Sequence, residues 1–412
     1  MDNTKQKIGV AIATGALLLN AFAPLAFAGT TIIINGNGSN SNNDVNVDYN
    51  RDVDVDQNND ADVNNDVNVD ANTGKNDANN NTGNGDVSIT TGNAEADVNV
   101  SNTLNANSAN VGCCDTGNTE VKISGNGTGS NNDVNLDKDT DINVDQDNDA
   151  DVNNDVNVDL DTGKNDANNN TGNGGVSITT GNAKGNASLS TVANFNHAVV
   201  GGGSNGGGSL SLWITDNGSY SNNDINVDAN SDIDVDQNND ADVNNDVDVD
   251  ADTGKNDANN NTGGDVMIDT GNAEATVETD DMVNFNHADV DCGCTFGDLF
   301  VKVDGNGTNS DNDVNVELDS DLNVDQDNDS DINNDVDVDP DTGKNDANNN
   351  TGEGDGDPSI TTGDTEANVD LSTSGNVNSF GSEMDFDFPD FDFDFDFSFS
   401  FDLEDLLGAL GL

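Results

Sequence analysis

The residues best able to do chemistry in this sequence are aspartates, which recur at fixed short spacings in four places. Each place carries the pattern Asp-x-(Asp/Asn)-x-Asp-x-x-x-Asp. Carboxylate and amide oxygens are the ligands that a hard divalent cation such as Ca²⁺ prefers. We therefore predict that Ca²⁺ is bound there, by Asp52, Asp54, Asp56, Asp60, Asp141, Asn143, Asp145, Asp149, Asp232, Asp234, Asp236, Asp240, Asp321, Asn323, Asp325 and Asp329.

Two known calcium-binding loops match these segments only in part. The pattern resembles the start of an EF-hand loop, but Gln57 stands where that loop needs Gly and Val63 where it needs Glu. The segment 82–90 resembles the nonapeptide of calcium-binding β-rolls, but has Val87 in place of a ligand Asp. A solvated acidic face without specific ion sites is the alternative prediction.

The cysteines form two close pairs that occupy equivalent places in the first and third of four repeats. An even number of cysteines in an exported chain favours disulfides, and both within-pair and between-repeat bridges are open. A zinc site made of four thiolates is a weaker alternative, because the pairs are far apart in the sequence. The candidates are Cys113, Cys114, Cys292 and Cys294.

No constellation of residues indicates catalysis, and we predict that the chain is not an enzyme. His197 and His287 lie in matching Asn-Phe-Asn-His-Ala segments, but the first repeat has Ser108 at that position. A structural or surface role is therefore expected for both histidines. Lys75 and its copies follow Gly without the rest of a phosphate-binding loop, and we expect these lysines to neutralise nearby aspartates.

The charge balance limits the partners that the protein can have. The 412 residues include 81 Asp and Glu against 11 Lys and Arg, for a net charge of −70. Phosphate backbones would be repelled, so we expect no nucleic acid partner. Cations, basic surfaces, a cell-surface component or other copies of the chain are the expected partners. Low hydrophobicity with high charge also leaves disorder open as an alternative.

The first 28 residues have the features of a secretory signal peptide. Lys5 and Lys7 precede a mostly apolar stretch, and residues 26–28 read Ala-Phe-Ala before Gly29. We therefore expect a secreted protein, located outside the cell or on its surface. No later stretch reaches the roughly 18 to 20 apolar residues of a membrane span, so none is predicted.

Internal repetition dominates the rest of the sequence. The segment Gly-Lys-Asn-Asp-Ala-Asn-Asn-Asn-Thr-Gly begins at Gly74, Gly163, Gly254 and Gly343, at spacings of 89, 91 and 89 residues. Repetition with a fixed long period indicates a repeat architecture. We predict a signal peptide (1–28), four repeats (29–124, 125–215, 216–304 and 305–384) and a distinct tail (385–412).

Each repeat contains a long run with period two. From Asp44 to Asn72 every even-numbered residue is Asp or Asn, while Val and Ala fill most odd positions. This alternation predicts a β-strand with one apolar and one wet face. A single strand of that length would span about 100 Å, so we expect the run to fold back, with corners at Gln57, Asn59 and Asn65.

Thr-Gly pairs punctuate the second half of each repeat, as at Thr73, Thr82 and Thr91, nine residues apart. Two strand-turn units of this length would make a coil of about 16 to 18 residues. We therefore predict an all-β fold, a β-solenoid of such coils within the four repeats of about 90 residues. Tandem β-sandwich modules are the alternative, although this fold normally needs more core aromatics than the sequence offers.

The segments 57–61 and 74–78, with their copies, resemble those of secreted bacterial repeat proteins rich in Asn and Asp. Curlin-type fibre subunits and solenoid adhesins are the nearest families in composition. The resemblance implies an extracellular structural or adhesive role. It also implies an alternative, a fibre subunit that assembles with itself.

The tail differs from the repeats because phenylalanine alternates with Asp or Ser in it. This pattern predicts an amphipathic strand with an aromatic face. Such a strand would either cap the last coil or pair with another molecule. The residues concerned are Phe391, Phe393, Phe395, Phe397, Phe399 and Phe401.

Overall fold

Every regular element of the described structure is a β-strand. The computed structural model describes residues 4–11, 17–21, 30–112, 118–201, 209–291, 298–352 and 358–381. These residues belong to one compact unit that ends at Gly381. Within these ranges the structure has no helix long and apolar enough to cross a bilayer.

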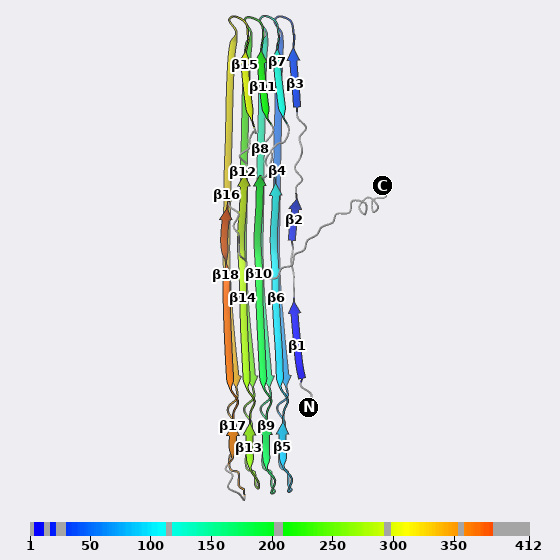
Figure 1. Ribbon diagram of the computed structural model, residues 1–412, viewed down its shortest axis with the longest axis vertical. Helices are drawn as coiled ribbons and strands as arrows, with labels where there is room; N and C mark the ends of the chain where they lie inside the picture. Colours follow the sequence, from blue (N-terminus) through cyan, green and yellow to red (C-terminus); the bar gives the residue numbers. More distant parts are fainter. Residues whose placement is uncertain are drawn as a thin grey trace, which may run out of the picture. The chain divides into compact units, whose positions relative to one another are not determined.

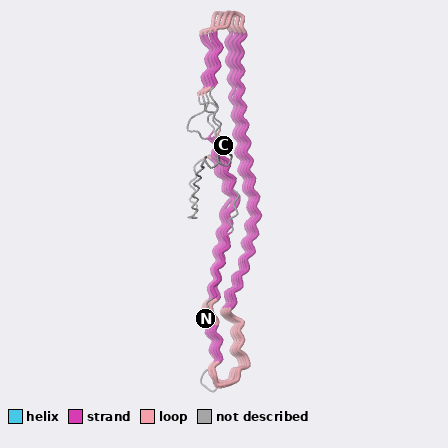
Figure 2. Tube along the Cα trace, turned by 90° about the vertical axis from the view of Figure 1, so that its right-hand side faces the viewer, coloured by secondary structure: helices cyan, strands magenta, loops and turns pink. Residues whose placement is uncertain are grey.

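One repeat forms one long, flat coil. In the first repeat, β3 (Thr30–Asn35) leads through a turn into β4 (Asn42–Asn72), and the chain returns through β5 (Val87–Thr90) and β6 (Ala94–Val111). The long strand makes one wall of the coil and the returning strands make the other, as the side view shows (Figure 2). The long alternating run is therefore a single strand of 31 residues.

The later repeats have the same four strands. They are β7 (Thr119–Ser124), β8 (Asn131–Asp161), β9 (Val176–Thr179), β10 (Ala183–Gly201), β11 (Leu210–Thr215), β12 (Asn222–Asp252), β13 (Val266–Asp269), β14 (Ala273–Asp291), β15 (Leu299–Asp304), β16 (Asp311–Asp341), β17 (Ser359–Thr361) and β18 (Thr365–Phe380).

Successive repeats stack as parallel layers (Figure 1). The long strands pair in the order β4-β8-β12-β16, and the three sets of returning strands follow the same repeat order. Asp44 lies beside Asp133, which lies beside Asp224 and so on, each residue pairing with its own copy. We call each repeat a layer and each row of equivalent side chains a ladder.

The expected all-β repeat fold with solenoid-like stacking is confirmed, but the expected coil of 16 to 18 residues is wrong. One turn of the stack takes 89 or 91 residues, because Asn42 pairs with Asn131 and Asn131 with Asn222. Separate sandwich modules are also wrong, since each long strand pairs with the next along its whole length. The described repeats therefore form four large layers instead of many short coils.

Valine and alanine fill the space between the two walls. Val144, Val152 and Val158 are fully buried, each in a different cluster with residues of the opposite wall. Burying such a side chain contributes about 1.5–3 kcal/mol relative to leaving it exposed. The narrow core needs no large aromatic residues because each layer covers the next.

The expected corners are also wrong, because Gln57, Asn59 and Asn65 point into the interior of the straight strand β4. Asn59 donates to Asn107 of the opposite wall at 2.7 Å and to its own copy, Asn148, at 2.9 Å. Gln146 donates to Gln57 at 2.7 Å. Buried amides are tolerated when they are hydrogen-bonded, and these form continuous ladders through the stack.

Asn105 shifts the inward-facing side of β6 by one residue. It has a positive φ of 53° and is passed over in the pairing of β6 with β10. Asn tolerates this left-handed conformation better than most residues. Its amide nitrogen donates to the carbonyl of Asp149 and, at 3.0 Å, to Asn194, so the bulge is repeated from layer to layer.

The Thr-Gly pairs are explained by close approach of layers as well as by turns. A Cβ added to Gly163 would lie 2.0 Å from the carbonyl oxygen of Gly254 in the next layer. Gly172 does have a positive φ, 153°, but a Cβ there would also lie 1.5 Å from the oxygen of Gly83. Only glycine fits these crossings.

Two strands precede the repeats. β1 (Thr4–Ala11) and β2 (Leu17–Ala21) pair parallel with β6, Thr4 beside Ala94 and Leu17 beside Ala106. They lie in the segment predicted to be a signal peptide, and the rest of that segment lies outside the described residues. Its proposed role in secretion stays a prediction.

Candidate cation-binding face

The outward side of the long strands is an acidic surface, which we call the acidic face. It consists of the alternate residues of β4, β8, β12 and β16 that point away from the core. Period two places all of these side chains on one side of the sheet. Nearly all of them are Asp or Asn.

Eight ladders on this face are acidic in all four layers. Neighbouring strands lie about 4.8 Å apart, and alternate residues of a strand about 6.6 Å apart. The face is therefore a nearly regular grid of carboxylates. In the first layer these ladders begin at Asp44, Asp48, Asp52, Asp56, Asp60, Asp62, Asp66 and Asp70.

The predicted calcium ligands all lie on this face, but they do not form a loop around one ion. Asp52, Asp54 and Asp56 lie on a straight strand, so their carboxylates are held apart instead of converging. No group of three or more His, Cys, Asp or Glu side chains is placed to hold a metal ion within the described ranges. The carboxylates that lie side by side belong instead to successive layers.

Five of the eight acidic ladders contain none of the predicted ligands. Those beginning at Asp44, Asp48, Asp62, Asp66 and Asp70 were missed because the prediction followed a loop motif. The signal that identifies them is the alternation over the whole strand combined with the spacing of 89 or 91 residues.

Partial burial and electrostatic repulsion together raise the pKa of several aspartates on the acidic face. Partial burial, together with Asp236 and Asp56 above and below it, raises the pKa of Asp145 over its usual value. Burial and acidic neighbours likewise raise the pKa of Asp141, Asp149, Asp236, Asp248 and Asp250. The grid thus carries unfavourable charge that a bound cation or proton would relieve.

Asparagines relieve part of this repulsion in alternating ladders. Asn143 donates to Asp54 at 3.3 Å, and Asn323 donates to Asp234 at 3.0 Å. Here an amide lies next to each carboxylate in place of a second charge. These ladders provide a natural comparison with the all-acidic ones.

A row of lysines neutralises a second row of aspartates at the end of the long strands. Lys164 lies 2.9 Å from Asp161 and 3.6 Å from Asp252, whose side chains are fully buried. Lys255 lies 2.6 Å from Asp252. The predicted role of Lys75 and its copies is confirmed, and the pairs link successive layers.

The remaining candidate residues lie elsewhere or outside the described part. His197 stacks on His287 with ring centroids 5.3 Å apart, and burial and that neighbour lower the pKa of His197. Both are members of one ladder on the returning wall. The cysteine candidates and the phenylalanines of the tail lie outside the described residues, so their predicted roles stay predictions.

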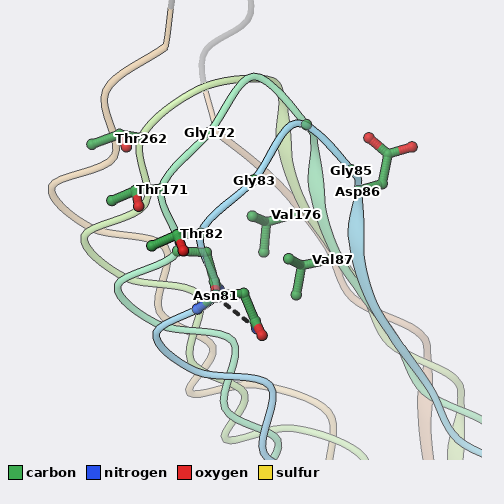
Figure 3. Close-up of a pocket in the computed structure, with 12 residues that line it drawn as sticks. Asn81, Thr82, Gly83, Gly85, Asp86, Val87, Thr171, Gly172, Val176 and Thr262 are labelled. Carbon is green, nitrogen blue, oxygen red and sulfur yellow. Dashed lines mark hydrogen bonds between the residues drawn. The ribbon is translucent and has the colours of Figure 1, made fainter.

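A small cavity lies inside the loops at the end of the coils where β5 and its copies begin (Figure 3). It has a volume of about 230 Å³ and is lined by residues that include Asn81, Thr82 and Val87. Asp86 also lines the cavity, and its carboxylate accepts a hydrogen bond from the Gly175 amide at 2.8 Å. This segment uses Asp86 to join two layers.

Comparison with known proteins adds no relative. No family model, no curated protein and no solved structure matches the chain.

Proposed function

We propose that the protein is an extracellular structural or adhesive repeat protein that displays a rigid acidic β-surface and binds divalent cations, with Ca²⁺ the candidate ion. The observation that carries the proposal is the set of eight all-acidic ladders on the acidic face. A cation between two carboxylates about 4.8 Å apart removes repulsion on both sides. Bound ions would also allow the face to bridge to other acidic surfaces.

The secretory signal and the resemblance to surface repeat proteins support the location outside the cell. Nothing in the described geometry presents converging catalytic groups, and the proposal is a non-enzymatic role. The −70 charge supports cations or basic surfaces as partners.

The test compares two double variants that remove the same charge from the same strand. Asp141→Asn with Asp149→Asn removes carboxylates flanked by aspartates in both neighbouring layers. Asp139→Asn with Asp147→Asn removes carboxylates flanked by asparagines. Calorimetric titration and thermal melting are recorded with Ca²⁺ and with NaCl at equal ionic strength.

We expect Ca²⁺ to raise the melting temperature more than NaCl does. The first double variant should lose more of this increase than the second. An equal effect of both salts would refute ion binding, and an equal loss in both variants would refute the role of the ladders.

A fibre subunit is the second candidate function, and a specific observation favours it. In the described part, β4 and β16 each have a neighbour on one side only. Long open edges of this kind are templates for pairing with another chain.

A further inference from the structure

The core of the fourth layer is open on one side. Val314 of β16 is 45% exposed, whereas its copies Val134 and Ile225 are 0% and 1% exposed. Leu322 is 50% exposed, and its copies in the second and third layers are buried. These are inward-facing side chains of the same ladders, so layer four lacks the cover that every earlier layer receives from the next.

The hydrogen-bonding edge of this layer is open as well. Among the described strands, β16 pairs only with β12 and β18 only with β14. The Thr253 amide donates to the carbonyl of Asp341, so the backbone groups of Asp341 point toward layer three. The backbone groups of alternate residues such as Pro340 point to the open edge. Pro340 removes one donor, and the rest of the edge remains able to pair.

The inner amides of this layer match those of layer one. Gln326 donates to Gln237 at 2.6 Å on its covered side, continuing the ladder that starts at Gln57. Asn328 and Asn334 continue the ladders that start at Asn59 and Asn65. A layer one placed on layer four would therefore extend these three amide ladders in register.

The opposite end of the stack is partly occupied. Thr4–Ala11 and Leu17–Ala21 lie along the edge of β6 that faces away from β10. Following the register through the layers, the copy of Ala94 in layer four is Thr365. Thr4 thus lies where Thr365 of a preceding molecule would pair.

We propose that copies of this chain stack head to tail, layer four of one on layer one of the next, and that β1 and β2 block this junction until they are removed. The contact continues the interface that already joins each layer to the next. The stacking rests on the proposed fibre-subunit function and specifies its contact. The proposed signal peptide enters only as the way in which the block is removed. Acidic ladders would cross the junction, for example Asp321 against Asp52, so assembly needs a screening or bridging cation.

The test uses the full chain with a specific protease site inserted between Ala28 and Gly29. Sedimentation velocity and electron microscopy follow the protein before and after cleavage, with Ca²⁺ and with NaCl. Two variants are compared: Leu322→Asp places a charge in the exposed core of layer four, and Ser374→Asp places one on the outward side of β18, in a ladder whose copies Thr103, Val192 and Met282 are uncharged. Thermal melting of the uncut variants verifies that both fold.

We expect the uncut chain to stay monomeric and the cut chain to form filaments. Leu322→Asp should reduce filament formation by at least about tenfold, a change of about 1.4 kcal/mol, and Ser374→Asp should leave it nearly unchanged. Cut chains that stay monomeric, equal assembly before and after cleavage, or equal assembly of both variants would overturn the proposal. Assembly that begins only when 382–412 are also removed would overturn it too, because the chain's own tail would then cover the end.

Calcium binding by the cut monomer is measured separately at low protein concentration. Ion binding without filaments refutes the stacking and leaves the cation-binding face standing. Filaments without a preference for Ca²⁺ support the stacking and count against that face.

Discussion

The buried amide ladders should contribute strongly to stability, and Asn148→Ala is the sharpest test. The Asn148 side chain accepts from Asn59 at 2.9 Å and from Asn107 at 3.0 Å. It donates to Asn196 at 2.7 Å and to Asn239 at 2.9 Å. The substitution therefore removes four buried hydrogen bonds from the middle of the stack.

Each such bond contributes about 1 kcal/mol net, and each of these four partners keeps at least one other bond. We expect a loss of about 4 kcal/mol in the free energy of unfolding. Asn153→Ala is the control, because Asn153 lies on the acidic face of the same strand and accepts one bond, from Asn244 at 3.0 Å. Its cost should stay below about 0.5 kcal/mol.

Denaturant unfolding followed by circular dichroism measures both variants at a fixed Ca²⁺ concentration. A midpoint for Asn148→Ala equal to that of Asn153→Ala would refute the interior placement of the amides. A free energy of unfolding for Asn148→Ala that is several kcal/mol below that of Asn153→Ala would support the interior placement.

Two further predictions concern the glycines and pH. Gly163→Ala should cost about 1–3 kcal/mol by overpacking, while Gly38→Ala, with nothing within 4 Å of its added Cβ, should be nearly neutral in the same denaturation assay. Burial and acidic neighbours raise the pKa of Asp145, so the folded chain binds more protons than the unfolded chain at pH values above the usual 3.8. The melting temperature should therefore rise as the pH is lowered from neutral toward 3.8. For Asp341, burial raises the pKa, but Lys344 and the Gly343 amide lower it more, so the net shift is downward. The stability that this carboxylate contributes is present at neutral pH and is lost only as the pH falls below 3.8. A melting temperature that falls as the pH is lowered from neutral toward 3.8 would contradict the assigned repulsion.

The strand character and the repeat period could be predicted from the sequence. Alternation from Asp44 to Asn72 indicates a β-strand with a wet face, and the structure has β4 over Asn42–Asn72. The neutralising role of Lys164 followed from the same pattern of charges.

The coil size could not be predicted because polar residues on an apolar side were taken as corners. Gln57 is hydrogen-bonded to groups distant in sequence, the carbonyl of Ser108 and the side-chain amide of Gln146. Its polar groups are hydrogen-bonded through the stacking of layers, which the local sequence pattern does not reveal. The spacing of 89 and 91 residues indicates the coil size, since it equals the register between paired strands of successive layers.

The same cause misdirected the candidate site. Asp52, Asp54 and Asp56 were grouped along the chain, as in a loop. The carboxylates that pair with Asp52 and Asp56 are instead those of their copies in the next layer, Asp141 and Asp145. Asp141, for example, lies directly beside Asp52 and Asp232. Sites formed by stacking are found by comparing equivalent positions of the repeats.

The most direct test of the layered fold is a distance measurement between spin labels on unnatural amino acids. Labels at Asn46 and Asn135, which pair in adjacent layers, should be about 5 Å apart at the backbone and show strong spin–spin broadening. Labels at Asn46 and Asp62, on one straight strand, should be about 53 Å apart and show none. Broadening for the second pair and none for the first would contradict the one-repeat layer.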